Sequence, residues 1–137
     1  MTVLVTDAGF QPATDMGFVP LADLAHHQGA VDLSNTDDPE ALQAALPDLN
    51  LIRIAFPAFN DGRAFTIARR LRELGYAGIL RAHGPVISDQ YPMARRVGFD
   101  QVEIPDELAA RQPEPQWLSH ADWRAHDYQA RLRAVNG

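Results

Sequence analysis

The sequence predicts an α/β fold: a single three-layer domain over residues 1–137, built on a mostly parallel sheet of about five strands. Three apolar runs, at residues 51–57, 77–82 and 99–104, alternate with two arginine-rich segments that have helical spacing. Alternation of strands and helices favours a parallel sheet joined by right-handed crossovers. Because such a sheet needs cover on both faces, we expect an open flavodoxin-like or Rossmann-like arrangement rather than a half barrel.

Glycine residues mark the ends of both predicted helices in this βαβαβ core, residues 51–104. Gly75 precedes Tyr76, and Gly98 precedes Phe99. Glycine suits the left-handed residue that closes a helix, because it has no Cβ atom to clash there. Each glycine–aromatic pair therefore indicates where a helix ends and the next strand begins.

The N-terminal third of the chain predicts further strands and one helix. Thr2–Thr6 and Ala30–Leu33 are short apolar runs with β-branched residues, and residues 18–21 form a shorter run. We expect these strands to add a mixed edge to the sheet. Asp38 followed by Pro39 is typical of a helix start, with an aspartate cap and a proline in the first turn.

After the core, the chain predicts a short helix that ends at Arg111, a proline-containing linker at residues 112–118 and a C-terminal helix at residues 119–135. Ser119 and Asp122 have the spacing of a capping box. We expect the C-terminal helix to dock on its own body or on another subunit, so self-association is one of our expectations.

Composition limits the chemistry that this chain can perform by itself. It contains no cysteine, which removes disulfides, thiolate nucleophiles and iron–sulfur ligation. It also lacks the glycine-rich dinucleotide and phosphate-loop motifs, so we predict no resident cofactor. Asp122 and His126 are expected to form a surface pair, and we predict no metal site.

Two further features bear on location. No apolar run approaches the roughly 20 residues that span a bilayer, and the N-terminal sequence MTVLVTDAGF lacks the basic start of a signal peptide. We therefore expect a cytoplasmic protein without a membrane partner.

Charge is distributed unevenly along the chain. The net charge of −6 argues against nucleic-acid binding. Residues 51–98, however, hold eight arginines against three acids. This positive stretch is either a solvated face, which is the usual case, or a docking surface for an acidic partner.

The polar turn Asp61-Gly62-Arg63 lies between a predicted strand end and a predicted helix start. Ligand sites in α/β sheets usually form at this edge. A helix N-terminus offers unpaired N–H groups and partial positive charge, and arginine adds a two-pronged donor. These features suit a small oxyanion such as sulfate, sulfite or a phosphate. The structural alternative is that Asp61 caps the helix, Gly62 allows the turn and Arg63 pairs with a carboxylate.

Four more residues complete the set of candidate ligand-binding residues. Arg81 and His83 end the next strand and lie on the same side of it, so we expect both to point into the same crevice as Arg63. His83 serves either as a structural hydrogen-bonding group or in proton transfer. Asp89 and Gln90 lie early in the next helix, where Asp89 either stabilises the first turn or orients one of the arginines.

Several motifs of the core resemble those of one bacterial family. They are F-P-x-F-x-D-G-R at residues 56–63, G-Y-x-G at 75–78, R-A-x-G at 81–84, D-Q at 89–90 and R-x-G-F-D at 96–100. The chain thus resembles the family known as domain of unknown function no. 934. The resemblance implies an association with sulfite reductase and assimilatory sulfate reduction, and members often carry an oxidoreductase label.

Two functions follow as expectations. The first is an accessory protein of assimilatory sulfate and sulfite reduction that binds a small oxyanion, sulfite reductase or both. The alternative is a cofactor-dependent oxidoreductase of the same pathway, with its site at the carboxyl edge of the sheet.

Overall fold

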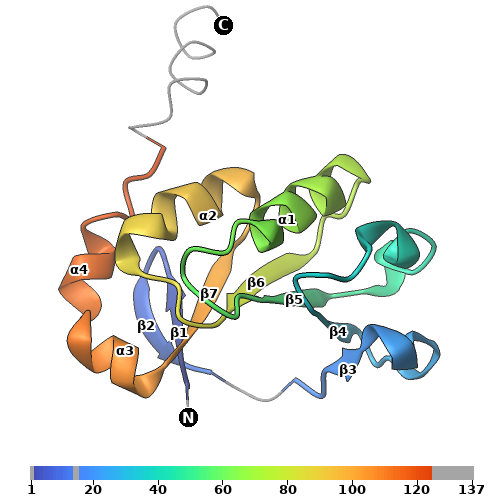
Figure 1. Ribbon diagram of the computed structural model, residues 1–137, viewed down its shortest axis with the longest axis horizontal. Coiled ribbons are helices and arrows are strands. Elements are labelled where there is room, and N and C mark those ends of the chain that lie inside the picture. The colour runs from blue at the N-terminus through green and yellow to red at the C-terminus, as the bar shows by residue number, and fades with distance from the viewer. Residues whose placement is uncertain (1, 14–15, 125–137) are drawn as a thin grey trace, which may run out of the picture.

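The computed structural model describes residues 2–13 and 16–124, which form one seven-stranded sheet with helices around it (Figure 1). The strands lie in the order β2-β1-β7-β6-β5-β4-β3. The parallel strands are β3 (Val19–Pro20), β4 (Ala30–Leu33), β5 (Leu51–Ala55), β6 (Ile79–His83) and β7 (Gln101–Pro105). An antiparallel hairpin of β1 (Thr2–Thr6) and β2 (Gly9–Pro12) pairs with β7. The predicted mostly parallel α/β sheet is confirmed, with more strands than expected.

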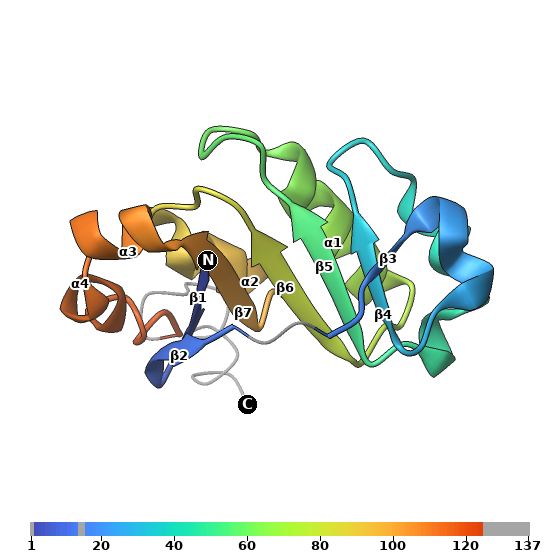
Figure 2. The same cartoon turned by 90° about the horizontal axis from the view of Figure 1, so that it is seen from below.

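The winding of the sheet differs from the prediction. Each parallel strand lies beside the one that precedes it in the chain, so the strand order never reverses as it does in flavodoxin-like folds. Successive right-handed crossovers in one direction place their helices on one face. Helices α1 (Arg63–Glu73) and α2 (Tyr91–Val97) indeed both lie behind the sheet in Figure 2. The expected flavodoxin-like arrangement with helices on both faces is therefore wrong.

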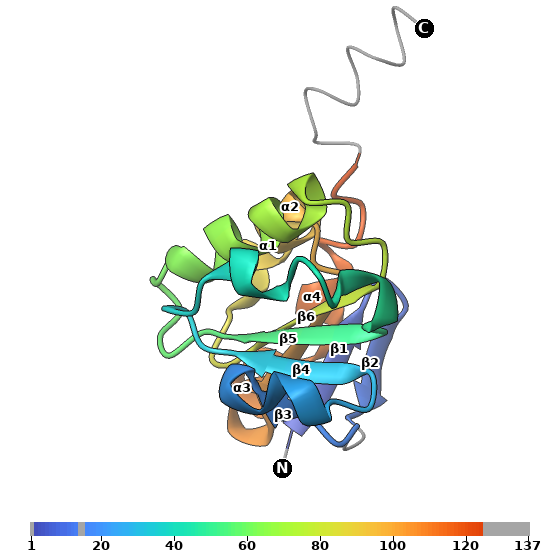
Figure 3. The same cartoon turned by 90° about the vertical axis from the view of Figure 1, so that its right-hand side faces the viewer.

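Short 3₁₀ helices make the remaining N-terminal connections. They are η1 (Leu21–His26), η2 (Pro39–Leu42) and η3 (Leu46–Asp48), with η4 (Ser88–Gln90) leading into α2. η2 and η3 lie on the same side of the sheet as α1 (Figure 3). Asp38 caps η2 by accepting a hydrogen bond from the backbone N of Glu40, as the sequence predicted.

Side chains of the strands alternate between an apolar and a polar face. Ile52, Ile54 and Leu80 are fully buried in the core beneath α1 and α2. Their neighbours Arg53 and Arg81 point to the opposite face. In the described part of the chain, no helix crosses the middle of that face, which we call the polar face (Figure 2).

The predicted glycine helix ends are confirmed. Gly75 has φ +96° and Gly98 has φ +119°, both in the left-handed region that favours glycine. Arg72 of α1 connects the two turns, because its guanidinium donates to the carbonyls of Tyr76 and Gly98 and pairs with Asp100 at 2.8 Å. This arginine of the positive stretch therefore has a structural role.

The C-terminal part forms two short helices, α3 (Asp106–Arg111) and α4 (Glu114–Leu118). α4 occupies the segment that the sequence predicted as a linker. Trp117 anchors it, since this side chain is 1% exposed and its Nε1 donates to the carbonyl of Gln112. The helix predicted at 119–135 does not start at Ser119, which is the C-cap of α4, and residues 119–124 are not helical. The rest of that prediction lies outside the described residues. No helix in the described ranges has the length and apolar character needed to cross a membrane.

Candidate functional site

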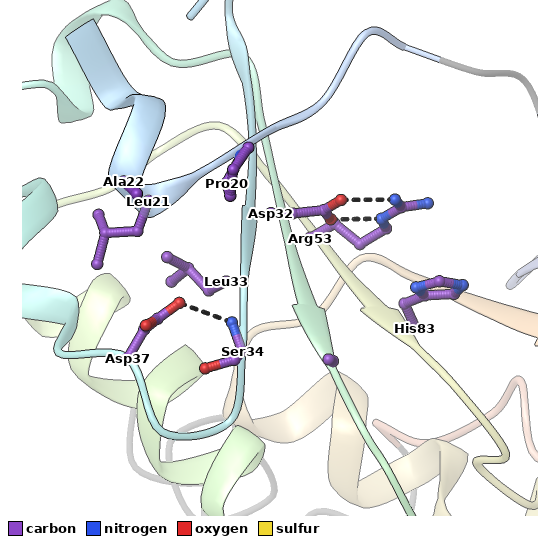
Figure 4. Close-up of a pocket in the computed structure, with 10 residues that line it drawn as sticks. Pro20, Leu21, Ala22, Asp32, Leu33, Ser34, Asp37, Arg53 and His83 are labelled. Carbon is purple, nitrogen blue, oxygen red and sulfur yellow. Dashed lines mark hydrogen bonds and ion pairs between the residues drawn. The ribbon is translucent and has the colours of Figure 1, made fainter.

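A cavity of about 450 Å³ opens at the carboxyl ends of the parallel strands (Figure 4). The last residues of β3, β4, β5 and β6 all line it: Pro20, Leu33, Ala55 and His83. Its other lining residues are Leu21, Ala22, Asp32, Ser34, Asp37 and Arg53. Ligands of α/β proteins usually bind at this edge, in cavities of this size. We call this cavity the edge pocket.

Arg53 lines the edge pocket and is held by two carboxylates. Its Nε and Nη2 donate to the two carboxylate oxygens of Asp32 at 2.6 and 2.7 Å. Its Nη1 donates to Glu103 at 3.0 Å, and the ring of Phe18 lies 3.9 Å from the guanidinium carbon. Such a two-pronged pair fixes the orientation of both side chains.

Glu103 is the centre of the polar face. It accepts hydrogen bonds from Arg53, from Arg81 at 3.1 Å and from the hydroxyl of Thr2 at 3.0 Å. Glu103 is 5% exposed and Arg81 4% exposed. Burial alone would raise the pKa of Glu103, but the hydrogen bonds from Arg53 and Thr2 prevail and hold the pKa below its usual value. Glu103 is therefore a buried anion that, together with Asp32, balances the charges of Arg53 and Arg81.

His83 is half-buried at the end of β6, where it reaches both Glu103 and the edge pocket. Burial lowers its pKa below the ordinary 6.5, the charge of Arg53 acts in the same direction, and Glu103 opposes them. The imidazole is therefore neutral near pH 7. Its Nε2 lies 3.4 Å from Glu103, so the carboxylate favours the proton on Nε2 and leaves Nδ1 as an acceptor.

A pH titration of the imidazole tests this description of His83. We expect a midpoint below 6.5, and a still lower one in Glu103→Gln, because that variant removes the negative charge that raises the pKa. A lowered pKa also means that the contribution of His83 to stability is complete above pH 6.5 and is lost as the pH falls below it. Proton NMR of the imidazole measures the midpoint, and a value at or above 6.5 would contradict the description.

The Asp61-Gly62-Arg63 turn leads into α1, as predicted, but its two charged side chains pair with each other. The guanidinium of Arg63 donates to both carboxylate oxygens of Asp61 at 2.9 and 3.2 Å, and its backbone N donates to the same carboxylate at 3.0 Å. Asn35 donates a further hydrogen bond to Asp61. Gly62 has φ −83°, which any residue adopts. Arg63 thus pairs with a carboxylate, as the structural alternative expected, but the N-cap of α1 is Gly62 and no side chain caps the helix. The side chain of Arg63 is 64% exposed.

Removal of Arg63 should raise the pKa of Asp61, the carboxylate of this turn. The hydrogen bonds from Arg63 lower the pKa of Asp61 from 3.8 to about 2. In Arg63→Ala we expect the pKa to return toward 3.8, measured by carboxyl-carbon NMR. An unchanged pKa of about 2 would show that other groups, such as Asn35, hold the carboxylate.

The expectation that Arg81 points into the same crevice as Arg63 is wrong. The strand that precedes Arg63, β5, lies beside β6, which contains Arg81, and the backbone N of Phe56 donates to the carbonyl of His83 at 2.7 Å. Arg81, however, is buried on the polar face and donates to Glu103 and Gln101. The spacing along the chain could not reveal that β7 would place this carboxylate beside Arg81.

Asp89 and Gln90 serve local structure. Asp89 is exposed and lies 3.4 Å from His120 rather than beside either arginine. Gln90 accepts a hydrogen bond from the backbone N of Ile87 and donates one to the carbonyl of Phe59. Gln90 therefore ties the loop after β5 to the start of α2.

Sequence reasoning missed three residues of the polar face: Asp32, Arg53 and Glu103. Each is a charged residue at the centre of an apolar strand, in AVDL, LIRIA and QVEIP. Such an alternation predicts a polar sheet face and was the signal available. Within residues 2–13 and 16–124, no group of three or more His, Asp or Glu side chains is arranged to hold a metal ion.

Comparison with known proteins identifies one family. The family model described as "Bacterial protein of unknown function (DUF934)" matches residues 30–136. This range includes β4 to β7, α1 and α2, and most residues of the edge pocket. No curated protein and no solved structure matched the chain. The chain therefore belongs to the DUF934 family of bacterial proteins.

Proposed function

We propose that this protein is a cytoplasmic accessory protein of assimilatory sulfite reduction that holds a small polar ligand in the edge pocket. The observation that supports a ligand is the pocket itself, which lies where β3 to β6 end and has both apolar and polar walls. The pathway is suggested by the resemblance of residues 56–100 to a family whose members are associated with sulfite reductase.

The charges around the edge pocket favour a ligand that donates hydrogen bonds over a small anion. The guanidinium of Arg53 is already bound by Asp32 and Glu103. Asp32 and Asp37 both line the cavity, and the neutral ring of His83 adds an acceptor. An anion placed beside two carboxylates is repelled. The proposed ligand is therefore uncharged or cationic and carries hydroxyl or amino groups.

Calorimetric titration with a panel of small amines and polyols tests the ligand class. We expect binding with a Kd below ~1 mM that is lost in Asp32→Ala and retained in Asp48→Ala, a matched variant at an exposed site away from the pocket. Equal loss in both variants, or binding by sulfite and sulfate in preference to the panel, would contradict this ligand class.

The pathway is tested separately by co-purification and calorimetry with purified sulfite reductase. The proposal expects a complex between the two proteins. If no complex forms at micromolar protein concentrations, sulfite reductase is not the partner. The edge pocket would then bind its ligand in a different pathway.

A small oxyanion at the start of α1 is the alternative ligand. The observation in its favour is the exposure of Arg63 at a helix N-terminus. Sulfate must then compete with Asp61, which already binds this guanidinium. Amide shifts of Gly62 and Arg63 during a sulfate titration would support the anion, and unmoved amides would exclude it from this turn.

The second candidate function is a cofactor-dependent oxidoreductase with the edge pocket as its active site. It is favoured by His83, a neutral proton acceptor that lines the cavity. Because the chain has no cysteine, any redox reaction would use a bound cofactor. Fluorescence titration with flavin mononucleotide and with a nicotinamide nucleotide tests this candidate, and binding that His83→Ala weakens would support it over the non-catalytic role.

A further inference from the structure

A second cavity is lined by residues of α1 and α2. These two helices lie on the side of the sheet away from the polar face (Figure 1). The cavity measures about 320 Å³ and is lined by Phe65, Thr66, Arg69, Met93 and Val97. Phe65 is held in place in this lining, because its ring packs edge-on against the core rings of Phe56 and Phe99. Met93 is 48% exposed, a large apolar side chain left open to solvent. We call this cavity the helix groove.

The arginines around the helix groove differ from the others of the positive stretch. Of the eight arginines in residues 51–98, most form ion pairs with carboxylates: Arg53, Arg63, Arg70, Arg72, Arg81 and Arg95. Arg69 and Arg96 are exposed and have no carboxylate partner among the described residues. The unpaired positive charge of this stretch is thus concentrated on two neighbouring helices.

Each of the two helices presents the same combination of side chains. On α1, Phe65 and Arg69 are four residues apart, and on α2, Met93 and Arg96 are three residues apart. These spacings place each apolar residue beside an arginine on one helical face. Arg69 lines the helix groove, and Arg96 lies one helical turn from Met93 on α2, so both helices that form this apolar groove carry a positive charge.

We propose that the helix groove is a docking site for an acidic segment of a partner protein, which inserts an apolar side chain between α1 and α2. Charge complementarity specifies the acidic character, because the two exposed arginines have no carboxylate partner in the described part of the chain and attract carboxylates. The apolar lining favours an apolar side chain of the partner as the inserted residue, since a buried side chain usually supplies most of the binding energy at a small interface. Exposed methionine is well suited to such contacts. This site does not depend on the ligand proposed for the edge pocket.

Fluorescence anisotropy with two synthetic peptides tests the proposal on the full chain. The probe is a labelled helical peptide with leucine at one face and glutamate at the other positions. The matched peptide has lysine in place of each glutamate. We expect the acidic peptide to bind at least about tenfold more tightly and its affinity to fall with added salt. Equal affinity for the two peptides would overturn the proposal.

Substitutions of residues that line the helix groove test whether the peptide binds there. Arg69→Glu and Met93→Glu should each weaken binding of the acidic peptide by about tenfold or more. Arg111→Glu is the control, because Arg111 is exposed, lies on α3 and has no carboxylate partner in the described part of the chain. An equal loss in Arg111→Glu would show that net charge alone drives binding. A homodimer in sedimentation that Met93→Glu dissociates would assign the groove to a second copy, and would also overturn the proposal.

Discussion

Replacing Glu103 with alanine is expected to destabilise the protein by about 3–5 kcal/mol, because it leaves buried positive charge without a partner. Arg81 is 4% exposed and Arg53 also donates to this carboxylate. Urea unfolding followed by circular dichroism measures the change, which should appear as a lower midpoint.

A matched exposed carboxylate controls for the loss of a negative charge. Glu73 is exposed on α1, and Glu73→Ala should change the free energy of unfolding by no more than about 0.5 kcal/mol. Glu103→Gln should fall between the two, because it keeps the shape and one acceptor. A Glu103→Ala protein as stable as Glu73→Ala would contradict the central position of Glu103 in the polar face.

Gly84→Ala is expected to be equally severe, at about 3–5 kcal/mol. Gly84 has φ +146°, and a Cβ atom there would lie 2.0 Å from the backbone oxygen of Phe56. The backbone of β5 or β6 must then move. Gly84 follows His83 directly and its N donates to the carbonyl of Glu103 at 3.0 Å. The movement should therefore also displace the histidine that lines the edge pocket.

Gly75→Ala measures the cost of placing alanine in a left-handed backbone conformation without a steric clash, whereas Gly84→Ala includes the clash. Gly75 has φ +96°, also in the left-handed region, but a Cβ atom there would meet nothing within 4 Å. We expect a cost of only about 1–2 kcal/mol and an unchanged NMR signal for His83. If the two variants proved equally stable, the close approach of Gly84 to Phe56 would be excluded as the reason for glycine at that position.

The sequence was sufficient to predict most elements of the fold. Apolar runs and glycine–aromatic pairs located β5 to β7, α1 and α2, because strand and helix periodicity and the left-handed helix end are local properties. The winding of the sheet is not local. The same strands and helices are compatible with a reversed or a consecutive order of strands in the sheet. Only packing between distant segments decides between these two orders.

The candidate site was predicted in part. His83 was named and lines the edge pocket, whereas Arg81 was expected to share a crevice with Arg63 and is instead buried on the polar face. The reason is that an arginine pairs with whichever carboxylate the sheet places beside it, and Glu103 lies 22 residues from Arg81 in the sequence. Asp32 and Arg53 reach the same cavity from neighbouring strands, which only the register of the sheet reveals.

The two faces of the molecule differ in chemistry. The polar face carries paired charges and a cavity at the strand ends, which suits a small ligand. The helical face carries, beside an apolar groove, two arginines that have no carboxylate partner within residues 2–13 and 16–124, which suits a protein partner. An accessory protein that binds a small molecule and docks on an enzyme would use both faces at once.

We propose that ligand binds in the edge pocket rather than at the turn before α1. Amide NMR mapping tests it most directly, during titrations with the tightest-binding amine or polyol of the panel and with sulfate. The account predicts that the amine or polyol causes the largest shifts at Ser34, Ala55 and His83. Shifts confined to Gly62 and Arg63 in both titrations, with the pocket amides unmoved, would contradict it.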